Sequence, residues 1–196
     1  MARRSDHTPQ ELRALLIREG HELLAELGFA RFSARAAAKR AGYSVGTIYN
    51  VFGSLDGYLV AINTHTFALW AAHLSAALEP ADDDRIAALV HGYFSFAEAN
   101  GNLWMAIYDH RLPDGMGMPE HDARARAALT QIVEEEVRRA LPEDTDVDVH
   151  RLTRSLIAVV HGHCSFALTG TFALLEEPDA VGSALARVRE TLSVLR

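Results

Sequence analysis

The sequence predicts an all-α fold of about nine helices. Apolar residues recur with a helical period of about 3.6 residues through most of the chain. No segment alternates apolar and polar residues between hairpin turns, as paired strands would. Gly and Pro interrupt the periodic segments where helices are expected to end. These observations favour a wholly helical fold over any fold that contains a sheet.

The first predicted helix spans about residues 9–27 and has suitable residues at both ends. Thr8 is the expected N-cap, Pro9 occupies the first helical position, and Glu11 completes a capping box. Gly28 is the expected C-cap. Gly20, in the helix interior, is expected to cost up to about 1 kcal/mol relative to Ala.

Two short helices follow, near residues 34–41 and 45–51. Ser33 and Ser44 are placed to cap them, and Gly42 closes the first. Two short helices joined by a tight turn that contains Gly form a helix-turn-helix pattern.

The remaining helices are longer. One is predicted over residues 55–79, where Pro80 stops it, and the others lie near residues 83–100, 102–111, 119–140, 148–175 and 178–195. Residues 112–119 (LPDGMGMP) are predicted to form a loop, because Pro and Gly break any regular structure there.

The composition is that of an ordinary globular protein. Of 196 residues, 49% are hydrophobic and 23% are charged, which excludes a disordered or collagen-like chain. The single cysteine, Cys164, excludes an intrachain disulfide framework. The first residues lack the apolar segment of a signal peptide. We therefore expect a protein of the reducing cytoplasm.

One segment, residues 155–175, contains no Asp, Glu, Lys or Arg and is long enough to span a bilayer. However, two histidines and several Gly, Ser and Thr residues lie within it. We expect a helix buried in protein, and no membrane partner.

The charge is distributed unevenly, although its net value is −7. Residues 1–56 contain eight basic residues (Arg or Lys) and six acidic residues (Asp or Glu), whereas residues 57–196 contain eleven basic and twenty acidic residues. A mildly basic N-terminal part on an acidic remainder is expected when only one part of a protein approaches phosphate groups.

The segment of residues 9–59 combines several specific features. The first helix ends in Gly28-Phe29, Ser33 opens the second helix, and Ala38, Ala41 and Gly42 suit a tight turn. Gly46-Thr47-Ile48-Tyr49 and then Phe52 suit a recognition helix and its exit. In this order, the features resemble the N-terminal DNA-binding domain of the TetR family of transcriptional regulators. His161-Gly162 in the uncharged helix loosely resembles one subgroup of that family.

The resemblance implies a sequence-specific regulator of transcription, most often a repressor. Such a protein binds a palindromic operator in double-stranded DNA as a homodimer and leaves it when a small-molecule effector binds. Residues 1–56 would form the helix-turn-helix DNA-binding domain, and residues 57–196 the ligand-binding and dimerisation domain.

The resemblance also implies which residues contact DNA. Phosphate contacts are expected from Ser33, Ser44 and Tyr49, and base-edge or groove contacts from Arg35, Val45, Gly46, Thr47 and Asn50. Arg3 and Arg4 lie on a short arm that can reach the minor groove or the backbone.

One position departs from the family's usual pattern. Leu55 stands where a Lys at the start of the fourth helix usually contacts phosphate. The loss is expected to reduce the salt dependence of binding by about one unit per half-site. An alternative is that the N-terminal domain has lost operator recognition while the remainder still binds a ligand or partner.

The last two predicted helices carry apolar stripes that can pack within the chain or against a second copy. The resemblance implies a four-helix dimer interface. The residues expected in it are Leu156, Val160, Val181, Leu185, Val188 and Leu192.

Aromatic residues gather in the middle helices. Each alone suits a core position, but the resemblance implies a small-molecule cavity among them. The expected lining consists of Phe67, Trp70, Tyr93, Phe94, Trp104, Tyr108 and His161. Its apolar character suggests a largely hydrophobic ligand.

We expect no metal, no cofactor and no catalytic residues. The ten histidines and Cys164 suit hydrogen-bonded core or surface positions better than a convergent metal site. The sequence also lacks a Gly-rich phosphate loop, a dinucleotide fingerprint and a nucleophile elbow, so an enzyme is not expected.

Overall fold

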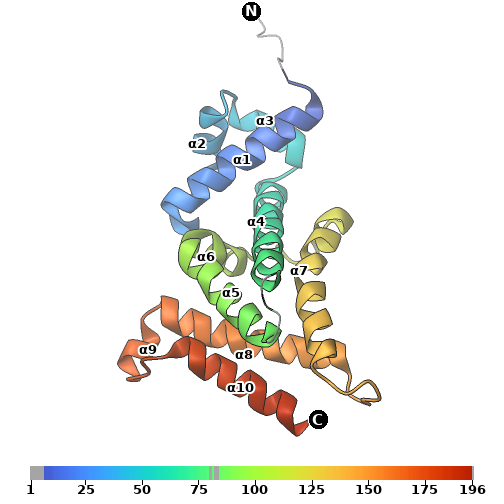
Figure 1. Ribbon diagram of the computed structural model, residues 1–196. Coiled ribbons are helices and arrows are strands. Elements are labelled where there is room, and N and C mark those ends of the chain that lie inside the picture. The colour runs from blue at the N-terminus through green and yellow to red at the C-terminus, as the bar shows by residue number, and fades with distance from the viewer. Residues whose placement is uncertain (1–6, 80, 82–83, 196) are drawn as a thin grey trace, which may run out of the picture. The chain divides into compact units, whose positions relative to one another are not determined.

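A computed structural model describes residues 7–79, 81 and 84–195. In this part of the chain there are ten α-helices, of which nine have seven or more residues. The prediction of an all-α fold of about nine helices is therefore confirmed. The helices, shown in Figure 1, are α1 (Pro9–Leu27), α2 (Ala34–Arg40), α3 (Val45–Phe52), α4 (Leu55–Leu78), α5 (Arg85–Ala99), α6 (Gly101–Asp109), α7 (Glu120–Arg139), α8 (Val149–Leu168), α9 (Thr171–Leu174) and α10 (Ala180–Val194).

The chain packs into two compact units. Unit 1 contains the described residues up to Phe67 together with Asn100–Ala125, and unit 2 contains Ala68–Ala99 and the described residues from Arg126 onward. The first half of α4 therefore belongs to unit 1 and the second half to unit 2. Helix α6 packs with unit 1, where the Asn102 side-chain amide donates a hydrogen bond to the carbonyl oxygen of Ala25 at 2.7 Å. A functional boundary after residue 56 stays a prediction.

The expected capping of α1 is present. The Thr8 hydroxyl accepts a hydrogen bond from the Glu11 N–H at 3.3 Å, and the Glu11 carboxylate accepts one from the Thr8 N–H at 2.7 Å. At the other end, Gly28 has a φ of 73° and its N–H donates to the carbonyl of Leu24. This conformation favours glycine, which explains why the helix ends there.

One predicted helix is interrupted. Residues 148–175 were expected to form a single helix, but α8 ends at Leu168 and α9 begins at Thr171. Between them, Gly170 has a φ of 75°, a left-handed conformation that an α-helix does not contain. The prediction was wrong because the apolar composition continues through the break while the backbone direction changes.

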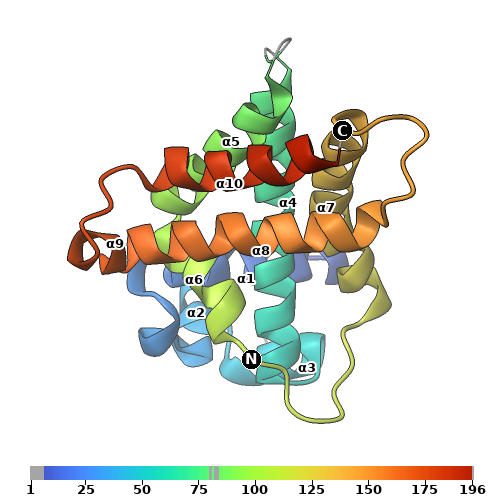
Figure 2. The same ribbon diagram turned by 90° about the horizontal axis from the view of Figure 1, so that it is seen from below.

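Unit 2 is built around α5, α8 and α10, which pack against one another. Helices α8 and α10 run side by side in both views, and their colours show opposite chain directions (Figure 2). In the described residues, no helix is both long and apolar enough to cross a membrane.

The core of unit 1 depends on a close approach of α4 to α1. Tyr58 is fully buried, and its hydroxyl donates a hydrogen bond to the Leu16 carbonyl at 2.5 Å. Gly20 is buried beside it, and a Cβ at this position would lie 2.7 Å from both Tyr58 Cζ and Ile62 Cδ1. Since ordinary contacts are much longer, only glycine leaves room for the Tyr58 ring.

We predict that Gly20→Ala destabilises the protein by about 1–3 kcal/mol, because overpacking outweighs the better helix propensity of Ala. Urea unfolding followed by circular dichroism measures this change. Gly101→Ala is the matched control, since a Cβ there meets no atom within 4 Å. A Gly20→Ala variant as stable as the Gly101→Ala control would contradict the packing argument.

Candidate nucleic-acid interface and ligand cavity

Helix α3 has one buried face and a wide exposed one. Ile48 is fully buried in the core of unit 1. Ser44, Gly46, Tyr49 and Asn50 are exposed, and Tyr49 is 47% accessible although it is large and aromatic. An aromatic side chain so exposed beside small and polar residues suits a surface that contacts another molecule.

Helix α2 positions α3 through small side chains and a tight turn. Ala37 and Ala38 are fully buried, which lets α2 lie close to α1. In the turn, Gly42 has a φ of 81° and the Tyr43 N–H donates to the Ala38 carbonyl at 2.8 Å. Two helices held at a fixed spacing by this turn can present α3 to a groove of DNA.

The predicted phosphate contacts differ in their local hydrogen bonds. The Ser33 hydroxyl accepts a hydrogen bond from the Ala36 N–H at 3.4 Å and caps α2 as expected. Ser44 occupies the N-cap position of α3, but its hydroxyl forms no cap hydrogen bond and lies 3.5 Å from Thr47 Oγ1. Ser44 is therefore the N-cap residue that the sequence predicts, but the expected hydrogen bond from a helix N–H to its side chain is absent. Its hydroxyl instead pairs with a residue predicted to contact DNA.

The other predicted DNA contacts lie on or beside the same two helices. Arg35 is exposed in the first turn of α2, while Val45 and Thr47 are partly buried in the first turn of α3. Arg3 and Arg4 lie outside the described residues.

Basic side chains near these helices fall into two groups. The Arg40 guanidinium donates two hydrogen bonds of 2.8 Å to the Glu26 carboxylate, which lowers the pKa of Glu26. Among the described residues, Arg35 and Lys39 form no ion pair. They lie four residues apart on α2 and so share one face. Lys39, which is exposed, is not among the DNA contacts predicted from the sequence.

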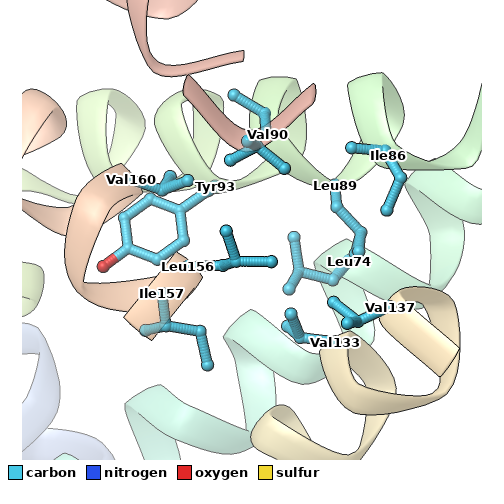
Figure 3. A pocket seen from close by; sticks show the side chains of 11 residues that line it. Leu74, Ile86, Leu89, Val90, Tyr93, Val133, Val137, Leu156, Ile157 and Val160 are labelled. Atoms are coloured by element: carbon cyan, nitrogen blue, oxygen red, sulfur yellow. The ribbon is translucent and has the colours of Figure 1, made fainter. Parts of the chain in front are cut away.

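Unit 2 contains a small apolar cavity of about 40 Å³. Figure 3 shows side chains from α4, α5, α7 and α8 that converge on it. The lining is aliphatic except for Tyr93, and consists of Leu74, Ile86, Leu89, Val90, Tyr93, Val133, Val137, Leu156, Ile157, Val160 and Val188. Of the predicted pocket residues, only Tyr93 lines this cavity.

Two other predicted pocket residues surround Tyr93. Its hydroxyl lies 3.0 Å from His161 Nδ1, and its ring meets the Trp70 ring edge-on with 4.7 Å between the centroids. Burial lowers the pKa of His161, so the imidazole is neutral at pH 7. The pair places one neutral polar contact at the edge of an otherwise apolar region.

The remaining predicted pocket residues lie elsewhere. Phe94 lines a separate open groove in unit 2 with His73, His91 and Glu98. Phe67, Trp104 and Tyr108 belong to unit 1, where the rings of the last two lie 5.1 Å apart. The aromatic set predicted as one lining is thus divided between the two units.

Five of the six residues predicted for the dimer interface are buried within the single chain. These are Leu156, Val160, Leu185, Val188 and Leu192, whereas Val181 is partly buried. The outer surface of α8 and α10 instead carries an open groove of about 580 Å³. It is lined by Ala158, Val159, Gly162, His163, Phe166, Phe172, Arg187, Glu190 and Thr191.

The thiol of Cys164 is fully buried in α8. Burial and the negative charge of Glu98 raise its pKa to about 12. Within the part of the chain that the structure describes, no three His, Cys, Asp or Glu side chains are grouped so that they could hold a metal ion.

Comparison with known families agrees with this arrangement. Residues 16–62 match the model of bacterial regulatory proteins of the tetR family. Residues 86–188, more than half of the chain, match the tetracyclin repressor-like C-terminal domain. The fold and the exposed recognition helix therefore define a helix-turn-helix regulator of transcription. The chain belongs to the TetR family, whose members bind DNA and are not enzymes.

Solved structures show the same fold over nearly the whole length. A protein of unknown function from Rhodococcus sp. RHA1 is 24% identical with a TM-score of 0.74, and the match covers 100% of this chain and 99% of that one. A TetR transcriptional regulator from the same organism is 20% identical with a TM-score of 0.70, covering 94% and 97%. RolR in complex with its ligand resorcinol is 20% identical with a TM-score of 0.67, covering 95% and 88%. No curated protein matches the sequence significantly.

We predict that His161 makes the fold less stable in mild acid. Because its folded pKa lies below the ordinary 6.5, the unfolded chain takes up the proton first as the pH falls below 6.5. The stability present above that pH is therefore progressively lost. Urea unfolding at pH 7.5 and 5.5 should show a smaller loss for His161→Gln than for the unsubstituted chain. An equal loss in both proteins would show that His161 does not contribute.

Proposed function

We propose that this protein is a repressor of the cytoplasm that binds a palindromic operator as a homodimer. A small, largely apolar ligand in unit 2 would release it from the DNA. The observation that carries the proposal is the exposure of Tyr49, Asn50 and Gly46 on α3 while Ile48 anchors the same helix. A helix held from one side only can enter the major groove with the other.

The proposed contacts divide by their chemistry. Thr47 and Asn50 offer hydrogen-bonding groups to base edges, and the methyl groups of Val45 or Thr47 can meet a thymine methyl. Gly46 allows close approach of the helix to the DNA. Ser33, Ser44 and Tyr49 are proposed to contact phosphate, and Arg35 to contact a base or the groove. These contacts would select a sequence, because phosphate contacts position a protein and base contacts specify its site.

The dimer would use the outer surface of α8 and α10. A palindromic operator requires two recognition helices related by twofold symmetry. Phe166, which is 45% exposed, lines the groove on that surface together with the small residues Ala158 and Gly162. A large ring next to small residues can be self-complementary across a twofold axis. The buried residues predicted earlier would support this surface from inside.

The ligand would bind in unit 2 by enlarging the cavity beside Tyr93. A volume of about 40 Å³ is far below that of a small-molecule site, which is usually about 300–1,000 Å³. Binding therefore requires the surrounding helices to move apart, and a ligand that favours the expanded form shifts the population toward it. The aliphatic lining and the resorcinol bound to RolR support a small, mainly apolar effector.

We predict that Thr47→Ala and Tyr49→Ala each weaken operator binding by about tenfold to a hundredfold without unfolding the protein. Fluorescence anisotropy on the intergenic DNA that flanks the gene, with competitor DNA present, measures the affinity. Circular dichroism confirms the fold. If both variants bind like the unsubstituted protein, α3 is not the recognition helix. If the unsubstituted protein does not bind even at low salt, the alternative of a DNA-binding domain without operator recognition is favoured.

We predict that Phe166→Glu converts the dimer to a monomer, because the carboxylate would be buried next to its symmetry mate. Light scattering coupled to size-exclusion chromatography gives the mass. Ser75→Glu, at an exposed position of α4, is the control and should remain dimeric. A dimeric Phe166→Glu variant would place the interface elsewhere.

We predict that a ligand which raises the melting temperature also releases DNA, because a ligand that binds the expanded folded form stabilises it against unfolding and also shifts the population away from the form that binds the operator. Resorcinol and other small phenols are the first probes. Val133→Phe, which fills the cavity, should abolish the stabilisation. Stabilisation without any change in operator affinity would contradict the inducer role.

A further inference from the structure

A second groove lies beside the recognition helix in unit 1. It has a volume of about 530 Å³ and is lined by His7, Pro9, Leu12 and Arg13 at the start of α1 and by Asn50 and Val51 on α3. The groove thus connects an exposed residue of the proposed DNA-reading surface with the first turns of α1. A molecule that contacts Asn50 can also reach the groove.

The guanidinium group of Arg13 is held in a defined position. Its Cζ atom lies 5.2 Å from the centre of the Phe52 ring. The Phe52 ring packs on Tyr58 with 4.8 Å between the centroids, and Tyr58 is itself fixed by its hydrogen bond to Leu16. A guanidinium stacked on a fixed ring loses little further freedom when it binds an anion.

The positive charge of Arg13 is not neutralised within the described part of the chain, where it forms no ion pair. By contrast, Arg18 on the same helix approaches both Glu19 and Glu22. The acidic residue nearest in sequence, Glu11, already accepts the Thr8 N–H in the capping box, and this hydrogen bond lowers the pKa of Glu11. In an acidic protein, a rigid and unpaired cation beside a DNA-reading helix is suited to an external anion.

We infer that Arg13 binds a backbone phosphate of the operator in the groove next to Asn50. The inference rests on the proposed DNA binding by α3. The sugar-phosphate backbone borders the major groove that α3 would enter, and Arg presents a planar fork of donors to phosphate oxygens. Leu55, which is 38% exposed at the start of α4, stands where the family usually has a phosphate-binding Lys. Arg13 would supply the positive charge that is missing there.

The test measures the salt dependence of DNA binding for Arg13→Gln, Arg13→Lys and Arg18→Gln. Anisotropy titrations at several salt concentrations, on flanking DNA and on unrelated DNA, give the slope of log affinity against log salt. Arg13→Gln should lower that slope by about one unit per half-site on both DNAs. Arg13→Lys, which keeps the charge, should restore it. Arg18→Gln should leave it unchanged, because that charge is already paired.

An Arg13→Gln slope equal to that of the unsubstituted protein would overturn the inference, while a loss of binding in Thr47→Ala would leave the proposed function standing. Weaker binding of both Arg13 variants with no change in slope would also overturn it, since Arg13 would then act through its packing on Phe52. Failure of the unsubstituted protein to bind any DNA would overturn both proposals together.

Discussion

The buried contact between Tyr58 and α1 is the constraint on which the DNA-binding surface depends. The absence of a side chain at Gly20 admits the Tyr58 ring, and the hydroxyl satisfies the Leu16 carbonyl at a point where water has no access. Phe52, the last residue of α3, packs on the same ring. Tyr58 therefore helps to position the end of the recognition helix relative to α1, together with the buried Ile48 in the same core. This explains why a helix as short as α3, whose own exposed face contributes nothing to burial, keeps a defined orientation.

The features that could be predicted from the sequence are those with short-range causes. The capping box at Thr8, the cap at Ser33 and the turn at Gly42 follow from local stereochemistry, and the structure confirms them. Ser44 shows the limit of such reasoning, because it occupies the N-cap position while its hydroxyl lies 3.5 Å from the Thr47 hydroxyl and accepts no hydrogen bond from a helix N–H. The need for glycine at position 20 could not be predicted from the sequence either. Helix propensity predicts only that Gly20 lowers stability, whereas the structure shows that glycine is needed there because Tyr58, far along the chain, packs against it.

Predictions about unit 2 were limited for a different reason. Helical periodicity identifies the apolar side of α8 and α10, but it does not say what that side meets. Leu156 and Val188 meet the interior of their own chain. The aromatic residues posed the same problem, since a list of large side chains contains no information about which of them share a unit. The cavity is lined mainly by Leu, Ile and Val, whose abundance makes any particular subset impossible to select from sequence.

The buried thiol of Cys164 has a practical chemical consequence. It is the only cysteine in the chain, and its burial and raised pKa keep it as an unreactive thiol in the folded protein. Maleimide or thiol-reactive spin-label reagents should therefore not modify Cys164 in the native protein. A single cysteine introduced on an exposed position of α3 would become the one site of attachment in each copy. In the proposed homodimer, the separation of the two recognition helices would then be accessible to spectroscopy without removal of any native residue.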